Sequence, residues 1–377
     1  MKIGISGYIG KYKTGIGRTL ENVLLELAKV DNNITYYLFI NYDQYELIRS
    51  AWPTNVKIIK YKVSKNNPIG NILWHQFYFQ MKLKQYKCDL SLIPNFSLLL
   101  WKSVPTVVVI YDLIEFNVLN KFSKLRVKYR YFSVPLMAKK ADKIITISKC
   151  SKDDIIKYCR VEESKIVIAY CGYDKNMFRE LTENDVYAKI KTYSMEPYSY
   201  ILYVGTIDYP GKNVFSLIKS FFYLKEKRNI REKLLIAGNS GYNSNIVFDL
   251  VRNSPYKNEV FFLGFVKDED LPFLYSGAKV FCYLSYYEGF GLPVLEAMAC
   301  GCPVIGSNSS SIPEILDNAG ILVDPNNIDE IADAIYGVIT SDNLGHSMKK
   351  KGLYRAESFS WNNAAARYYE VLKKLNS

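Results

Sequence analysis

The chain has 377 residues, a formal net charge of +12 and 23% charged residues, a globular composition that favours anionic partners. Because single hydrophobic cores stop growing near ~250–300 residues, this length predicts two domains, and no apolar run approaches the ~18–20 residues that span a bilayer. Seven cysteines without paired spacing and two distant histidines argue against a disulfide framework and a zinc site, and favour the reducing cytosol.

The first half of the chain alternates short β-branched runs with helical periodicity, which is typical of parallel sheets with crossover helices. The amino-terminal stretch MKIGISGYIG predicts a first strand and not a signal peptide. Leu20, Val23, Leu24 and Leu27 share one apolar face and predict a helix starting near Gly17. The strand candidates are KIGIS (2–6), YYLFI (36–40), VKIIKY (56–61), LSLI (90–93), TVVVIYD (106–112), KIITIS (143–148) and KIVIAY (165–170).

Basic residues concentrate in the segment 121–143, where no acid precedes Asp142. Tyr129, Tyr131 and Phe132 are interleaved with them, which is typical of an interface-seeking amphipathic helix, and a solvated helix face is the alternative. No nucleic-acid-binding signature accompanies the charge, so nucleic acid is not an expected partner. The basic residues are Lys121, Lys124, Arg126, Lys128, Arg130, Lys139 and Lys140.

The rhythm of strands and helices is lost between Gly172 and about Pro197, and we place the domain junction there. Both halves open with a strand, a loop and a helix, so the sequence predicts two doubly wound α/β domains that bind a ligand in the cleft at the carboxyl ends of their strands. The chain ends in an amphipathic helix capped by Ser360. The later strand candidates are SYILYVG (199–205), KLLIAG (233–238), VFFLG (260–264), KVFCYL (279–284), PVIGS (303–307) and GILVD (320–324).

The stretch YYEGFGLPVLEAMACGCPVIGS, residues 286–307, places Glu288 in a glycine-rich loop and Glu296 in the helix that follows. Pro293 fits the first helical position and Gly301 the position just past the end. The Gly-Phe-Gly turn lets the backbone approach a ligand and leaves N–H groups at the helix start, which predicts an anion site. Two carboxylates beside a phosphate could each accept hydrogen bonds from hydroxyl groups, one from a sugar and one from a ribose. The alternative is a tight strand-to-helix turn whose acids are favoured only by the helix dipole.

Two further glycine loops connect a strand to a helix. In YVGTIDYPGKN (203–213), Gly205 ends a strand and Lys212 precedes the next helix, where a cation is unfavourable unless an anion is bound; a solvated lysine is the alternative. In GKYKTGIGRTL (10–20), Gly15 and Gly17 lack the last glycine of a dinucleotide fingerprint, which disfavours a nicotinamide site. This loop could bring its backbone and Arg18 to a substrate, or be only a tight turn.

Asp112 ends a buried strand, at the edge where doubly wound sheets place function. It could orient a substrate hydroxyl or cap the following turn. The acids of DED (268–270) are interpreted as the start of a helix and not as a metal site.

Together these motifs, with FFLGFVKDEDLPFLYSGAKVF (261–281) and the order of segments along nearly the whole chain, resemble the family-4 retaining glycosyltransferases of GT-B architecture, bacterial mannosyltransferase-like members above all. The resemblance implies a donor-binding domain over 179–358. It also implies an acceptor-binding domain over 1–178 to which a final helix over 359–377 crosses back.

The resemblance also implies site residues. Glu288 would hold the hydroxyls of the donor sugar, Glu296 the ribose, and Lys212 the β-phosphate, with Glu288, Lys212 and Asp112 as the candidate catalytic group. The remaining donor-binding candidates are backbone positions on glycine loops, together with Arg18. They are Gly15, Gly17, Gly205, Thr206, Gly264, Phe265, Val266, Gly289, Phe290, Gly291 and Leu292.

By the same resemblance we expect transfer of a hexosyl group, preferably mannosyl from GDP-mannose, to a glycan or lipid-linked glycan in surface polysaccharide synthesis. No metal and no cofactor are expected, and the enzyme should be cytoplasmic, with peripheral association at the inner face of the membrane. A non-catalytic nucleotide- or glycan-binding protein of the same fold, or a sugar-nucleotide epimerase, is the alternative.

Two of the departures from the family pattern bear on the site. Gly211-Lys212 stands where Arg-Lys is common, so a phosphate cation is missing or supplied by Arg18. Tyr111-Asp112 stands where His-Asp is common, and a tyrosine, with an ordinary pKa of ~10, is a poor base at neutral pH.

Overall fold

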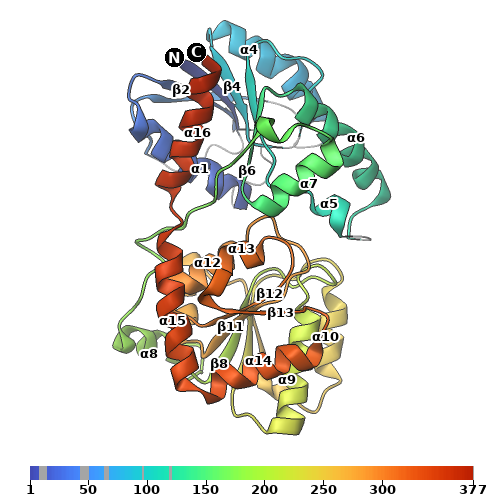
Figure 1. Ribbon diagram of the computed structural model, residues 1–377, viewed down its shortest axis with the longest axis vertical. Coiled ribbons are helices and arrows are strands. Elements are labelled where there is room, and N and C mark those ends of the chain that lie inside the picture. Colours follow the sequence, from blue (N-terminus) through green and yellow to red (C-terminus); the bar gives the residue numbers. More distant parts are fainter. Residues whose placement is uncertain (8–14, 43–50, 63–67, 96, 119–120, 377) are drawn as a thin grey trace. The chain divides into compact units, whose positions relative to one another are not determined.

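The structure, a computed structural model, describes residues 1–7, 15–42, 51–62, 68–95, 97–118 and 121–376 (Figure 1). The chain divides into two compact units. The amino-terminal unit contains Met1–Phe116, Phe122–Gly172 and Ser360–Ser377, and the carboxy-terminal unit contains Asn117–Lys121 and Tyr173–Phe359. The final helix therefore returns to the first unit.

The units divide after Gly172, earlier than the boundary that the sequence placed after residue 178. Gly172 lies against the start of the last helix, since a Cβ on it would come within 2.2 Å of the Trp361 nitrogen. Phe178 already packs in the carboxy-terminal unit, with its ring against Tyr275 at a centroid distance of 6.3 Å. The segment Asn117–Lys121, which the sequence assigned to the first domain, also belongs to the second unit.

Seven parallel strands form the sheet of the amino-terminal unit, in the order β3-β2-β1-β4-β5-β6-β7. Each is one of the sequence candidates, and the central strands are almost wholly buried because helices cover both faces. The sheet reverses its direction of winding between β1 and β4. The strands are β1 (Lys2–Ser6), β2 (Thr35–Asn41), β3 (Val56–Tyr61), β4 (Leu90–Ile93), β5 (Thr106–Val109), β6 (Lys143–Thr146) and β7 (Ile166–Ile168).

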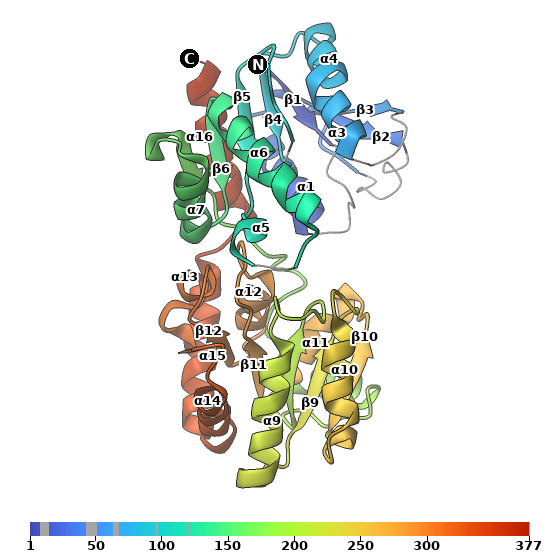
Figure 2. The ribbon, with the colours of Figure 1, turned by 90° about the vertical axis from the view of Figure 1, so that its right-hand side faces the viewer.

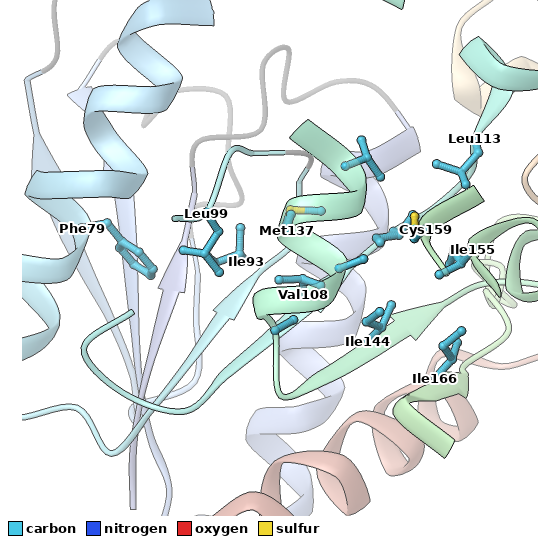
Figure 3. Close-up of a cluster of buried hydrophobic side chains, with 14 of the residues drawn as sticks. Phe79, Ile93, Leu99, Val108, Leu113, Met137, Ile144, Ile155, Cys159 and Ile166 are labelled. Carbon is cyan, nitrogen blue, oxygen red and sulfur yellow. The ribbon is translucent and has the colours of Figure 1, made fainter. Parts of the chain in front are cut away.

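Helices α1 and α16 pack together on one face of this sheet, and α4, α6 and α7 cover the other (Figures 1 and 2). Figure 3 shows the core beneath the second group, one buried cluster that includes Phe79, Met137 and Ile155 from these helices and Val108 and Ile144 from the strands. Ser360 caps α16 as predicted, since its Oγ accepts from the Asn363 N–H at 3.1 Å. The helices are α1 (Gly15–Val30), α3 (Pro68–Leu73), the π-helical turn η1 (Trp74–Tyr78), α4 (Phe79–Gln85), α5 (Ile114–Asn117), α6 (Lys124–Lys140), α7 (Lys149–Cys159), the 3-10 turn η2 (Glu163–Lys165) and α16 (Trp361–Asn376).

Six parallel strands form the sheet of the carboxy-terminal unit, in the order β10-β9-β8-β11-β12-β13. The first strand, β8, lies in the middle next to β11, so the chain winds outward on one side and then on the other, as in a doubly wound domain. The strands are β8 (Tyr200–Val204), β9 (Lys233–Ala237), β10 (Val260–Gly264), β11 (Val280–Tyr283), β12 (Val304–Ser307) and β13 (Ile321–Val323).

The helices of this unit again form two layers. Helix α9 packs with α10 and α14, whereas α11 packs with α8 and α12, and α12 with α15. Within the described ranges, no helix combines the length and apolar character needed to cross a bilayer. The helices are α8 (Glu183–Lys191), α9 (Val214–Arg228), α10 (Ser244–Arg252), α11 (Leu271–Gly277), α12 (Leu292–Ala299), α13 (Ile312–Leu316), α14 (Ile328–Thr340) and α15 (Asp342–Glu357), with 3-10 turns η3 (Lys257–Glu259), η4 (Asp268–Asp270) and η5 (Asp317–Ala319).

A buried histidine lies at the carboxyl end of β1 in the amino-terminal unit. His75, on η1, is fully buried, with Nε2 2.9 Å from Ser6 Oγ and Nδ1 3.0 Å from the Asn71 carbonyl oxygen. Because a carbonyl oxygen only accepts, Nδ1 carries the proton and Nε2 accepts from the Ser6 hydroxyl. Burial lowers the pKa of His75 to about 4, so the ring is neutral at neutral pH.

We expect His75 to make the amino-terminal unit sensitive to mild acid. The unfolded chain binds a proton at the ordinary pKa of about 6.5, while the folded state binds it only near 4. The stability is therefore fully present above about pH 6.5 and is lost as the pH falls toward 4, by about 3 kcal/mol in all. The four tryptophans all lie in this unit, so denaturant unfolding followed by tryptophan fluorescence reports it.

The matched variants are His75→Gln and His346→Gln, the second at an exposed histidine of the other unit. His75→Gln should remove this part of the pH dependence and His346→Gln should keep it. An equal acid-induced loss in wild type and His75→Gln would show that another group is responsible.

Candidate functional site

The two central strands of the carboxy-terminal sheet bring two predicted residues together. β8 is followed by the loop that carries Lys212, and its neighbour β11 by the loop that carries Glu288. The direction of winding reverses between these strands, and doubly wound sheets bind ligands at the carboxyl ends of strands at such a reversal. Strand order thus joins two motifs that are far apart in the sequence.

Lys212 and Glu288 form an ion pair, with Nζ 2.5 Å from Oε1. Tyr283, the last residue of β11, donates its hydroxyl to the same Oε1 at 2.9 Å and accepts from Lys212 Nζ at 3.2 Å. Only 20% of the Lys212 side chain and 13% of the Glu288 side chain are exposed. The three groups form a closed hydrogen-bonded triangle, which we call the Lys212–Tyr283–Glu288 triangle.

The charges of the triangle stabilise each other. Burial alone would raise the pKa of Glu288, but the Lys212 ammonium and neighbouring hydroxyl groups hold it below its ordinary value. Burial would likewise lower the pKa of Lys212, and the charge of Glu288 keeps it raised. Burial first and Glu288 second raise the pKa of Tyr283 well above its ordinary value, so the phenol stays protonated and donates. The pair is ionised at neutral pH.

Serines after β12 hold the loop of Glu288 in place. The Oγ of Ser310 accepts from the Glu288 N–H at 2.7 Å and donates to its carbonyl oxygen at 2.6 Å, and Ser311 donates to the Phe290 carbonyl oxygen at 2.6 Å. Gly291, with φ +109°, leads into α12, and a Cβ there would lie 2.7 Å from Ile312. Only glycine fits this conformation and this space, which is why the loop carries one.

The loop of Lys212 is fixed by Asp208. One oxygen of Asp208 accepts from the Lys212 N–H at 2.7 Å, and the other pairs with Lys121 Nζ at 2.8 Å. Gly211 has no side chain, and its carbonyl oxygen accepts from the Tyr286 N–H at 3.1 Å. The loops after β8 and β11 are therefore tied together through their backbones.

Three glycines end the neighbouring strands β8, β9 and β10 with positive φ: Gly205, Gly238 and Gly264. A Cβ on Gly238 would lie 1.9 Å from the Gly205 carbonyl oxygen, so the strand ends approach too closely for a side chain. Thr206 and Phe265 beyond them are exposed, Phe265 to 69%, whereas Val266 is 9% exposed. The predicted backbone positions thus lie along one edge of the sheet.

Glu296 lies inside α12 and is 8% exposed. Its Oε2 accepts from the Tyr275 hydroxyl, on α11, at 3.2 Å. The structure therefore gives this carboxylate a position in the helix that follows Glu288, with a phenol partner that the sequence did not indicate. Its contact with a ribose stays a prediction.

The candidates of the amino-terminal unit are only partly described. Gly15 and Gly17 begin α1, with Gly15 and Arg18 exposed, and the loop before them lies outside the described residues. Asp112 Oδ1 accepts from the Ile114 N–H at 3.2 Å, so it caps the start of α5; a role with a substrate hydroxyl stays a prediction. Burial raises the pKa of Tyr111, which is 4% exposed, well above its ordinary value, so it is no general base.

Sequence reasoning missed Tyr283, Asp208 and Lys121. Tyr283 was read as part of a buried strand, yet its place as the last residue before the functional loop was a usable signal. Asp208 lies four residues before Lys212 in the same loop, which is a weaker signal. Nothing in the sequence links Lys121 to this edge, because its neighbours in the chain indicated a basic helix.

Comparison with known proteins covers both units. The family model described as glycosyl transferases group 1 matches residues 189–354, and the model described as glycosyltransferase family 4 matches residues 13–176. The O-antigen chain mannosyltransferase B of Escherichia coli is 32% identical over 78% of this chain and 76% of its own. The O-antigen chain mannosyltransferase RfbU of Salmonella typhimurium is 26% identical over 87% and 90%.

The chain also matches the serotype-specific mannosyltransferase WbdA of Escherichia coli at 28% identity, but it spans only 32% of that longer relative. Among solved structures, the sucrose-phosphate synthase of Thermosynechococcus elongatus superposes with a TM-score of 0.81 at 19% identity, over 100% of this chain and 99% of that one. At that identity the likeness establishes the fold alone.

Removing the ammonium of the triangle should destabilise the carboxy-terminal unit. In Lys212→Met the carboxylate of Glu288 stays largely buried without its charged partner, and breaking a buried pair in this way costs about 3 kcal/mol or more. Without the ammonium, burial should raise the pKa of Glu288, so protonation removes the unpaired buried charge and the variant should regain stability as the pH falls through that raised value. Urea unfolding followed by far-UV circular dichroism measures both effects.

The double variant Lys212→Met/Glu288→Gln removes both charges and is the matched control. It should recover most of the lost free energy of unfolding, because neither side chain then carries an unpaired charge. Additive losses in the double variant would show that the two groups do not interact.

Proposed function

This chain belongs to glycosyltransferase family 4, a family of retaining enzymes, and from that premise we propose that it transfers a mannosyl group from GDP-mannose to a glycan or lipid-linked glycan acceptor in bacterial surface polysaccharide synthesis. The names of the O-antigen mannosyltransferases among its relatives support the sugar and the pathway class. The observation that carries the proposal is the Lys212–Tyr283–Glu288 triangle at the strand reversal of the carboxy-terminal sheet.

The triangle offers the two kinds of contact that a sugar diphosphate needs. An ammonium group has three N–H donors, and Glu288 and Tyr283 use two of those on Lys212, which leaves one for a β-phosphate oxygen. The second oxygen of Glu288 can accept from the sugar hydroxyls. A phosphate and a hydroxyl-rich ring would then lie on either side of one ion pair. Glu296 would receive the ribose and the edge at Gly264–Val266 the base. Gly15 and Gly17 stay predicted contacts of the diphosphate.

The reaction replaces one bond to the anomeric carbon with another. The bond between that carbon and the β-phosphate oxygen breaks, with its electron pair passing to the phosphate, and Lys212 stabilises the charge that develops there. The acceptor hydroxyl oxygen forms the new bond from the same face, which retains the configuration. The proton of the acceptor hydroxyl passes to the departing phosphate oxygen. Tyr111 does not accept it, because burial raises its pKa well above the ordinary value and the phenol stays protonated. No cofactor enters this sequence, and the charge stabilisation rests on the chain's own cation.

The donor is tested with a panel of nucleotide sugars. GDP-mannose should raise the melting temperature and give transfer, since a ligand stabilises the folded state that binds it. Glu288→Ala should lower the turnover by about a hundredfold, the scale of losing a group that acts on the reacting centre. Glu259→Ala is the matched control and should keep wild-type activity. Glu259 lies just before β10 and forms an ion pair with Lys225 at 3.2 Å.

Full activity in Glu288→Ala would remove the assigned role of the triangle. Transfer from another nucleotide sugar, with none from GDP-mannose, would overturn the donor and leave the family unchanged.

We further propose that the amino-terminal unit docks on the inner face of the cytoplasmic membrane. Helices α4 and α6 cover the same face of its sheet (Figure 2). Large apolar side chains are exposed on α6 and along the continuous run from the end of α3 through η1 into α4. Neither 68–88 nor 118–141 contains an acid, and lysines flank the apolar side chains. Such a surface suits an anionic bilayer, which attracts bases and accepts aromatic rings. We call this the docking surface: Leu73, Phe77, Tyr78, Met81, Leu125, Tyr131 and Phe132, with Lys82, Lys84, Lys124 and Lys128.

Docking is tested by sedimentation with vesicles. The protein should bind anionic phosphatidylglycerol vesicles and not neutral ones, and Phe77→Ser/Phe132→Ser should weaken binding by about tenfold or more, the scale of exposing two buried aromatic side chains. Tyr354→Ser, at a 78% exposed tyrosine of the other unit, should bind as wild type. Equal binding by all three would disprove the docking surface.

A further inference from the structure

Position 211 lacks the side chain that the family pattern commonly supplies, and another residue fills its place. An ideal Cβ on Gly211 would lie 2.7 Å from Lys121 Nζ and 3.4 Å from Lys121 Cδ. The ammonium of Lys121 therefore lies over the backbone of the residue directly before Lys212. It reaches this point from a segment of the first half of the sequence that packs with the carboxy-terminal unit.

We propose that Lys121 is a second cation of the donor site and contacts the diphosphate beside Lys212. The inference rests on the proposed function, because it needs a nucleoside diphosphate at this strand reversal. In this proposal Lys121, and not Arg18, supplies the second cation, because the structure places the Lys121 ammonium beside the backbone of Gly211.

The position of Lys121 is fixed by the group that fixes Lys212. Asp208 uses one oxygen for Lys121 Nζ, at 2.8 Å, and the other for the Lys212 N–H, at 2.7 Å. The Gly211 carbonyl oxygen in turn accepts from Tyr286, two residues before Glu288. A single carboxylate thus holds the Lys121 ammonium and the Lys212 backbone side by side.

The burial of this pair suggests a role beyond stability. The side chain of Lys121 is 12% exposed and that of Asp208 is 6% exposed, and ion pairs so buried contribute little net stability, because desolvation offsets their attraction. The four charged groups, Lys121, Lys212, Asp208 and Glu288, sum to zero without ligand. A diphosphate bound beside Lys121 and Lys212 would add negative charge that the two ammonium groups can balance.

A second cation predicts a specific pattern of binding. Lys121 would act on the diphosphate, so its removal should weaken a nucleoside diphosphate much more than a nucleoside monophosphate. A purely structural ion pair would instead weaken both ligands alike, through the stability of the loop. Calorimetry with GDP and GMP, at matched ionic strength, separates the two roles.

In Lys121→Met we expect the affinity for GDP to fall by about tenfold and the affinity for GMP by less than about threefold. Lys121→Arg should keep most of the preference for GDP over GMP, because the positive charge remains. Gly211→Ala should give a loss of the same kind, since its methyl group would lie 2.7 Å from the Lys121 ammonium and displace it. The methyl group would also lie 2.9 Å from Asp208 Oδ1, so Lys121→Met remains the sharper test. Gly211 has no positive φ, so alanine meets no backbone strain there.

Lys225→Met is the matched control. Lys225 is also a largely buried lysine, 8% exposed and paired with Glu259, but it lies near the amino-terminal ends of the same strands. It should leave both affinities unchanged. Equal loss of GDP and GMP in Lys121→Met, or no loss, would overturn the inference. Failure of the wild type to bind any nucleoside diphosphate would instead overturn the proposed function.

Discussion

A buried ion pair between Lys212 and Glu288 is the interaction on which the site depends. Each charge would be costly alone in this environment, so neither residue can be placed without the other. Their loops follow different strands, and the pairing of β8 with β11 is what brings the two charges together. The site therefore depends on the strand order of the carboxy-terminal sheet.

The neighbours of the pair serve mainly to hold its position. Tyr283 completes the triangle, Ser310 holds the backbone of Glu288, and Asp208 holds the backbone of Lys212. Each is a hydrogen bond made before any ligand arrives, and preorganised groups of this kind lose little free energy through rearrangement during a reaction. In the proposed complex the ion pair stays in place, and phosphate and sugar bind to its remaining donor and acceptor, so no buried charge is left unpaired.

The amino-terminal unit repeats the doubly wound plan and uses it differently. At the end of its first strand it keeps a neutral buried histidine, where the other unit places ionised groups. Its surface differs as well, because the run from α3 through η1 to α4 and helix α6 expose apolar and basic side chains together. The family relationship assigns glycosyl transfer to the chain as a whole. In our proposals the two units contribute different parts of it: one the charges for a diphosphate, the other a surface for an anionic bilayer.

The sequence by itself determined the strands, the alternation of strands and helices, the family, and the loops that carry Glu288, Lys212 and Glu296, because periodicity and glycine patterns are local. It placed the boundary at 178 and read 121–143 as one basic helix, because local pattern does not show which unit a segment packs against. Only the tertiary structure decided that Lys212 meets Glu288 and that Asp112 caps a helix. It also decided that Lys121 fills the space left by Gly211, since each of these depends on strand order or packing between segments distant in the chain.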